Sequence, residues 1–99
     1  MEIAIVPVGT KTASVSKYIA SSIEILKKEK HIKYKLNSMG TIIEADSVER
    51  LLGIATKMHN RVLNRRVKRV VTTVKIDDKR NKELTMAKKI KSVRKKLRS

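Results

Sequence analysis

Glu44 is the acidic side chain whose place in the sequence most suggests a binding role. Its neighbours alternate in a predicted strand, Thr41–Ala45, so its side chain is expected on the same partly apolar face as Ile42. A carboxylate in surroundings of low dielectric is a strong partner for a cation. Two ordinary alternatives stay open: a strand glutamate that faces solvent, or one that pairs with Lys75 from another strand.

Hydrogen-bonding side chains gather at the turn before this strand and at the start of the first predicted helix. Amide and hydroxyl groups supply donors and acceptors for a heterocyclic ring, a helix N-terminus favours an anion such as a phosphate ester, and a methionine at a pocket edge packs on a flat ring. The candidates are Asn37, Ser38, Met39 and Thr41 at the turn, and Thr10 and Ser14 at the helix. The alternatives are turn and cap chemistry for the polar residues and a place in the core for the methionine.

Catalytic and metal-binding chemistry finds little support. The chain has no cysteine, which excludes disulfides, thiolate catalysis and cysteine-based metal sites. His31 and His59 have no acidic or sulfur partners at ligand spacing and are expected to be solvated. The three glycines form no phosphate-binding loop, and the Asp77–Asp78 pair is interpreted as a turn or cap with local salt bridges. We therefore expect a protein that is not an enzyme and requires no cofactor.

The positive charge is large, with 25 Lys and Arg against 9 Asp and Glu, a net charge of +16. Clustered cations neutralise phosphates, so nucleic-acid binding is the alternative function. The candidate contacts are Arg61, Arg65, Arg66, Lys68 and Arg69, with further cations in the tail 88–98. Aromatic residues on which bases stack are scarce, since the chain has two tyrosines and no phenylalanine or tryptophan. Such binding is expected to be non-specific and salt-sensitive. The alternative interpretation of these cations is a helix face that is simply solvated.

Hydrophobic periodicity predicts six elements and an additional helix. Alternating or β-branched runs predict strands at Glu2–Pro7, Lys33–Ser38, Thr41–Ala45 and Val67–Ile76. Apolar residues at spacings of three and four predict helices at Thr12–Lys30, after an Asp46 N-cap, and at Asn81–Leu97. The order β-α-β-β-α-β is that of an α+β ferredoxin-like sandwich. Residues 1–78 are expected to form this domain, with 79–99 as a basic helical extension packed on it.

The same patterns predict burial and assembly. Tyr34 and Leu36 share a register that indicates the core, and the second helix is expected to bury Val48, Leu51, Leu52, Ala55, Met58, Val62 and Leu63. Gly53 in that helix costs about 1 kcal/mol relative to alanine, and it either allows close packing or is simply tolerated. The first strand is apolar on both faces, and helices on one side of a sheet leave the other side exposed. Self-association through the sheet is therefore predicted, although the net charge opposes it.

Several strings in sequence order resemble one known family. They are Ile5-Val-Pro-Val-Gly9, Ser14-Val-Ser-Lys-Tyr18, Tyr34-Lys-Leu-Asn-Ser-Met-Gly-Thr41 continuing through Ile43-Glu44, and Lys75-Ile-Asp-Asp-Lys-Arg80. Their order over nearly the whole chain is similar to the MTH1187-type family, also called DUF77 or UPF0045, a thiamine-binding-like family of the MTH1187/YkoF-like superfamily. The chain departs from the family pattern at Ser38, where proline is expected, and at Ala45, where glycine often follows the glutamate.

The resemblance implies a ferredoxin-like fold whose subunits associate through their sheets into homodimers and homotetramers. It also implies thiamine or a related pyrimidine or thiazole compound as a ligand, and it implies no catalytic activity. On that basis Glu44 would meet the thiazolium cation, and the amide and hydroxyl groups at the turn would bond to the aminopyrimidine ring. No apolar run reaches the roughly 20 residues of a membrane span, and the first ten residues lack the basic region of a signal peptide, so we expect a cytoplasmic protein.

Overall fold

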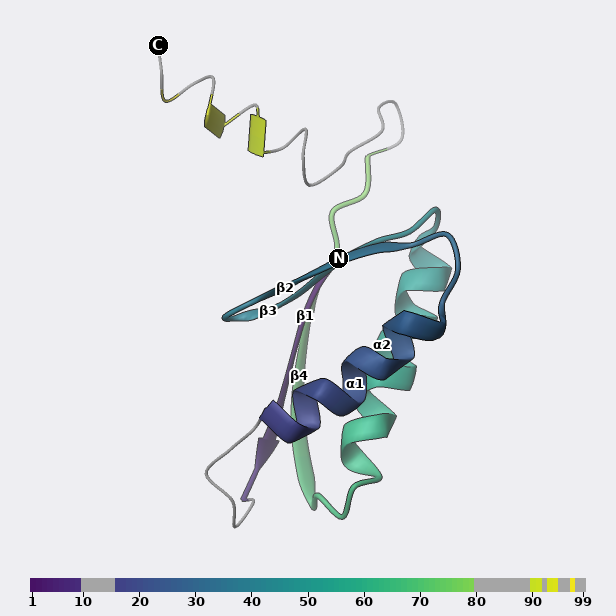
Figure 1. Ribbon diagram of the computed structural model, residues 1–99, viewed down its shortest axis with the longest axis vertical. Coiled ribbons are helices and arrows are strands. Elements are labelled where there is room, and N and C mark those ends of the chain that lie inside the picture. Colours follow the sequence, from purple (N-terminus) through teal and green to yellow (C-terminus); the bar gives the residue numbers. More distant parts are fainter. Residues whose placement is uncertain (10–15, 80–89, 92, 95–96, 98–99) are drawn as a thin grey trace.

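A computed structural model of the protein describes residues 1–9, 16–79, 90, 91, 93, 94 and 97. One antiparallel sheet has the strand order β2-β3-β1-β4, built from β1 (Glu2–Val8), β2 (Lys33–Asn37), β3 (Gly40–Glu44) and β4 (Arg69–Lys75). Helices α1 (Ser16–Lys28) and α2 (Val48–Leu63) lie against the same side of the sheet (Figure 1). The element order and the strand order confirm the predicted α+β ferredoxin-like architecture.

The strand register decides which side chains the helices cover. Successive side chains of a strand point to opposite faces, so Ile3 and its partner Thr41 share the face that carries the helices, and both are buried. Val6 and its partner Val71 share the other face, where they are 51% and 44% exposed. The sheet therefore has a covered face and an open face, and the open face keeps exposed valines.

The core lies between the covered face and the two helices. Its largest fully buried side chains are Ile3, Leu26, Ile43, Ile54, Met58 and Val62. They come from two strands and both helices, so each helix is fixed to the sheet by buried apolar contacts. Aliphatic and methionine side chains thus fill the interior of a chain that has almost no aromatic residues.

Helix α2 begins one residue later than predicted. Its N-cap is Ser47, in an extended conformation, and the Ser47 hydroxyl accepts a hydrogen bond from the backbone N–H of Arg50 at 3.2 Å. The prediction of Asp46 as the N-cap was wrong, because the serine hydroxyl and not the neighbouring carboxylate meets the free N–H groups of the first turn.

Four side chains that the patterns assigned to the core are exposed. Leu52 (48%) and Leu63 (36%) face solvent on α2, whereas Ile54, which the predicted stripe left out, is 2% exposed. Tyr34 (38%) and Leu36 (56%) lie in β2, where every residue is exposed. β2 is an edge strand of the sheet, and the β2–β3 hairpin reaches away from the helices (Figure 1). Alternation along a strand does not reveal whether a helix covers it.

Parts of two predicted helices fall outside the described residues. Helix α1 was predicted from Thr12, and residues 10–15 are not among those described; the helix ends at Lys28, with two lysines in its last turn, where cations suit the helix dipole. Most of the predicted C-terminal helix, Asn81–Leu97, also lies outside, while residues 90, 91, 93, 94 and 97 are helical. The packing of that helix and the division into 1–78 and 79–99 stay predictions.

Candidate functional site

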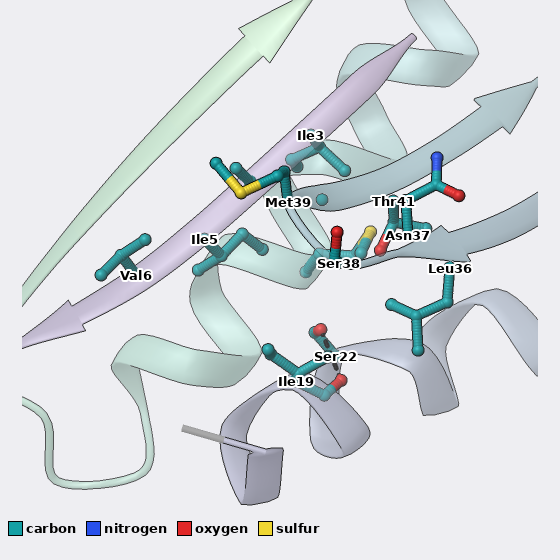
Figure 2. A pocket seen from close by; sticks show the side chains of 13 residues that line it. Ile3, Ile5, Val6, Ile19, Ser22, Leu36, Asn37, Ser38, Met39 and Thr41 are labelled. Atoms are coloured by element: carbon teal, nitrogen blue, oxygen red, sulfur yellow. Dashed lines mark hydrogen bonds between the residues drawn. The ribbon is translucent and has the colours of Figure 1, made fainter. Parts of the chain in front are cut away.

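A pocket of about 250 Å³ lies where the β2–β3 hairpin separates from β1. It is lined by residues 3–6 of β1, residues 36–41 of the hairpin, Ile19 and Ser22 of α1, and Met58 of α2. Figure 2 shows the hairpin side chains on one side of this space and Ile5 and Val6 on the other, with the α1 residues completing the wall. Four segments that are separate in the sequence therefore meet at one small cavity.

The pocket exists because two neighbouring strands part early. β1 pairs with β4 along all seven of its residues, but its register with β3 contains only Glu2 and Ile3. Past that point the hairpin turns at Ser38 and Met39 instead of continuing beside β1. A gap replaces the missing part of the ladder, and residues 4–6 of β1 border it.

Gly40 marks the point where the strands part. A Cβ atom at this position would lie 2.9 Å from the backbone oxygen of Ile3 and 3.7 Å from the Cβ of Ala4. The hairpin backbone approaches β1 this closely because glycine has no side chain. Gly40 thus sets both the last contact between the strands and the place of the turn beside the pocket.

The lining is apolar inside and polar at the hairpin. Met58 and Ile3 are 1% and 2% exposed, while Asn37 and Ser38 are exposed and Thr41 is 5% exposed. No charged residue is among the lining residues that the structure describes. Pockets for drug-sized ligands measure about 300–1,000 Å³, so this uncharged cavity lies just below that range and has room for a small ring system.

Four residues predicted from the sequence come together at the pocket: Asn37, Ser38, Met39 and Thr41. Met39 is 85% exposed, so it lies at the lip of the pocket and not in the core, which was its alternative place. Thr10 and Ser14, the candidates at the first helix, lie outside the described residues.

The α1 wall was missed by sequence reasoning. Ile19 and Ser22 are three residues apart on the apolar stripe of the helix, and the Ser22 hydroxyl donates to the Ile19 backbone oxygen at 2.8 Å. Their common helix face was visible in the sequence. The gap that this face borders was not, because it depends on how far β3 runs beside β1.

Glu44 does not line the pocket. It alternates with the buried Ile43 and therefore lies on the open face, opposite Lys33 of β2 in the register. The predicted alternative partner, Lys75, stands opposite Glu2 instead. The role of Glu44 as the partner of a cation stays a prediction.

Comparison with known proteins places these features in a family. A family model described as thiamine-binding protein matches residues 1–94. The chain belongs to the thiamine-binding protein family. A UPF0045 protein of Methanothermobacter thermautotrophicus is 36% identical over 97% of this chain and 96% of its own length. A second, YqgV of Bacillus subtilis, is 38% identical over 97% of this chain and 94% of its own length.

Solved structures of similar proteins show the same fold. The crystal structure of a hypothetical protein from Methanocaldococcus jannaschii has a TM-score of 0.82 and 42% identity, covering 93% of this chain and 91% of that one. A domain of unknown function, DUF77, from Bacillus cereus has a TM-score of 0.77 at 21% identity, covering 90% of this chain and 83% of that one. These relatives of the family carry no enzymatic name.

The predicted basic contacts lie where α2 leads into β4. Two of them reach toward α1: an Arg61 nitrogen lies 3.6 Å from a Glu24 carboxylate oxygen, and Arg65 Nε donates to the Ser21 hydroxyl at 2.9 Å. Arg66, Lys68 and Arg69 are exposed, and Arg66 has a positive φ of 61°. None of these cations lines the pocket.

Further polar contacts tie the helices together and to the sheet. The Glu29 carboxylate accepts a hydrogen bond from Lys57 Nζ at 2.8 Å and lies 3.5 Å from the Arg50 guanidinium. The hydrogen bond from Lys57 and the positive charges of Lys57 and Arg50 lower the pKa of Glu29. His59 Nδ1 lies 2.6 Å from the Thr72 hydroxyl. The prediction that His59 is merely solvated was wrong, because it bridges α2 and β4.

The described part of the chain contains neither a metal-binding cluster nor a membrane-spanning helix. No group of three or more His, Cys, Asp or Glu residues there is placed to hold a metal ion. No helix within the same residues is long and apolar enough to cross a membrane.

Proposed function

We propose that the protein binds thiamine or a related aminopyrimidine compound in the pocket between β1, α1 and the β2–β3 hairpin, and that it acts as a binding protein and not as a catalyst. The observation that carries this proposal is the neutral, ring-sized cavity with Asn37, Ser38 and Thr41 on its hairpin side. Amide and hydroxyl groups offer both donors and acceptors to a ring. The family description supports the same class of ligand.

Glu44 fits this proposal through the open side of the pocket. The thiazolium of thiamine is a cation, and the described lining supplies no negative charge for it. The lining does include Ala4 and Val6, which share the parity of the open face, and Glu44 lies on that face. We assign to Glu44 the attraction of the cationic part of the ligand while the neutral ring occupies the pocket.

A calorimetric titration with thiamine at about 150 mM salt tests the proposal, because surface charge is largely screened there. We expect saturable binding to the unaltered protein. Asn37→Ala should weaken it by about fivefold to tenfold, since a ring-facing hydrogen bond contributes about 1 kcal/mol. Lys35→Ala is the matched control on the same strand, since Lys35 does not line the pocket. Absence of any saturable heat with the unaltered protein would contradict the proposal.

Glu44→Ala separates the ligand from its predicted partner. Loss of thiamine binding in this variant supports the role of the carboxylate. Full binding by Glu44→Ala keeps the pocket as the site and contradicts the role of Glu44 as the partner of the cation.

Self-association through the open face is a second part of the proposed function. It is supported by the cross-strand pair Val6 and Val71, which are 51% and 44% exposed, and by Val8 at 37%. The net charge of +16 opposes assembly, so added salt should favour the homo-oligomer. Sedimentation of the unaltered protein and of Val71→Lys at low and high salt tests this: a monomer under all conditions would contradict it.

The alternative function is non-specific binding of nucleic acid by the junction of α2 and β4. It is supported by exposed Arg66, Lys68 and Arg69, for which the described residues supply no ion pair. Phosphate contacts of this kind weaken by orders of magnitude between about 50 and 200 mM salt. Binding to a nucleic acid that persists across this range, or that survives alanine at all three positions, would contradict it.

A further inference from the structure

The backbone N–H and C=O groups of β1 point alternately toward β3 and toward β4. The hydrogen bonds of Met1 show which residues point toward which strand. The Met1 ammonium donates to the backbone oxygen of Ile43 at 2.9 Å, and the Ile43 N–H donates to the backbone oxygen of Met1 at 2.8 Å. Both backbone groups of Met1 therefore point toward β3. In an antiparallel sheet the next residues with this direction are the third, fifth and seventh, while the fourth and sixth point toward β4.

Ile5 is the first residue of β1 whose β3-directed groups have no strand opposite them. Ile3 stands opposite Thr41, and two residues further the position opposite Ile5 falls to Met39. Met39 belongs to the turn, and within the described residues no backbone hydrogen bond joins Ile5 to it. The N–H and C=O of Ile5 are directed into the gap that the pocket occupies, and Ile5 lines that pocket.

Pro7 is an independent sign that this edge carries no ladder. It is the next residue with the same direction, and proline has no N–H to donate. Proline occurs within sheets where the N–H side of the strand has no partner. β1 is a central strand in the sheet order, yet it contains a proline on its β3 side and is paired along its full length on the β4 side.

An aminopyrimidine has the edge that this backbone needs. Its exocyclic amino group is a donor, and the adjacent ring nitrogen is an acceptor. In an extended residue the C=O and N–H point the same way, side by side, as in a hydrogen-bonded strand pair. We propose that the Ile5 backbone recognises the ligand: its C=O accepts from the amino group and its N–H donates to the ring nitrogen, so that the ring takes the place of the strand residue that β3 does not supply.

This inference rests on the proposed function and explains how the pocket would select its ligand. The ring would lie in the plane of the sheet, with Gly40 and Thr41 at one side and the Ile5 backbone at the other. Selectivity then comes from main-chain atoms, which side-chain substitution does not remove. Compounds without a neighbouring donor and acceptor on one ring edge should be rejected, because the backbone groups would be left unpaired.

The test replaces one backbone N–H at a time. An α-hydroxy acid analogue of isoleucine at position 5 replaces its N–H by an ester oxygen and keeps the side chain. The matched control is the same change at Ala4, whose N–H points toward β4 and whose ester leaves the N–H and C=O of Ile5 intact. We expect thiamine affinity to fall about tenfold for the ester at 5, and much less for the ester at 4, which should instead lower the urea midpoint.

A second measurement needs no altered protein. In ¹⁵N–¹H spectra of the unaltered chain, thiamine should shift the Ile5 amide more than those of Ala4 and Val6. An analogue of thiamine with hydrogen in place of the amino group should bind at least tenfold more weakly, because the Ile5 carbonyl loses its donor.

The outcomes separate this inference from the proposed function. Thiamine binding to the unaltered protein, with unchanged affinity for the ester at 5 or an unmoved Ile5 amide, overturns backbone recognition and leaves the binding function in place. No thiamine binding to the unaltered protein overturns both. Selective loss at position 5 together with the Ile5 shift supports both.

Discussion

The two ends of β1 differ in their strand pairing and in their burial. At its start, Glu2 and Ile3 pair with strands on both sides, Met1 adds two backbone bonds to Ile43, and Ile3 is 2% exposed. Toward its end, the strand is paired with β4 alone, Val6 is 51% exposed, and the pocket replaces the second neighbour. The difference teaches that the buried, doubly paired part of β1 and the part that borders the pocket are separate segments of one short strand.

Ile3→Ala should have the largest effect. Ile3 is 2% exposed, and deletion of a buried aliphatic side chain costs about 2–5 kcal/mol of the free energy of unfolding. Val6→Ala is the control at the other end of the strand and should cost about 0.5 kcal/mol or less, since it is half exposed. Urea denaturation of both variants measures the contrast, and equal losses would show that the two ends are not energetically distinct.

Gly40→Ala should cost about 1–3 kcal/mol by overpacking, because its Cβ would lie 2.9 Å from the Ile3 backbone oxygen. The obstacle is backbone, so the hairpin must move away from β1. We also expect weaker thiamine binding at protein concentrations where the variant is folded. A fully stable variant with normal affinity would mean that the close approach of the strands does not shape the pocket.

Gly53→Ala should act in the opposite direction. Nothing lies within 4 Å of a Cβ at this position, and Gly53 is in the middle of α2 with an ordinary negative φ. Alanine should therefore stabilise the protein by about 0.5–1 kcal/mol through helix propensity. The midpoint of thermal unfolding would rise, with no change in ligand binding; a fall would reveal a packing contact at this glycine.

The smallest effect concerns Glu29, which follows α1 and pairs with Lys57 and Arg50 of α2. Its pKa in the folded protein is below the ordinary value of 4.5, mainly because of the hydrogen bond from Lys57. Its contribution to stability is complete above the unfolded pKa and is lost as pH falls through the folded pKa. The difference in urea midpoint between the unaltered protein and Glu29→Gln should shrink below about pH 4.5, and a constant difference would contradict this.

The fold followed from the sequence because periodicity and turn chemistry agreed. The β-branched run ending at Ile76 and the stripe of α1 each predicted an element that the structure contains, and the predicted hairpin is present with its turn at Ser38 and Met39, one residue earlier than the expected Met39–Gly40. The errors in predicted burial share one cause. Leu52 and Tyr34 are apolar residues whose burial depends on what lies across from them, and a pattern along one element does not contain that information.

The candidate site was predictable only on its hairpin side. Polar residues around a turn are a local signal, so Asn37, Ser38 and Thr41 could be selected from the sequence. Ile5 could not be selected, since its part in the inferred site is played by backbone atoms that every residue has. Those atoms matter through the register of β1 and β3, which is a property of the assembled sheet.

Pro7 has a consequence for the behaviour of the protein in a crowded solution. A strand edge with free backbone groups is a template on which a foreign chain adds and aggregation begins. Along the β3 side of β1, an added strand would form its bonds at Ile5 and then meet Pro7, which has no hydrogen to offer. This edge therefore offers two backbone bonds at Ile5 and cannot extend them into a continuous ladder, which suits the small ligand that we propose and disfavours the addition of a foreign strand.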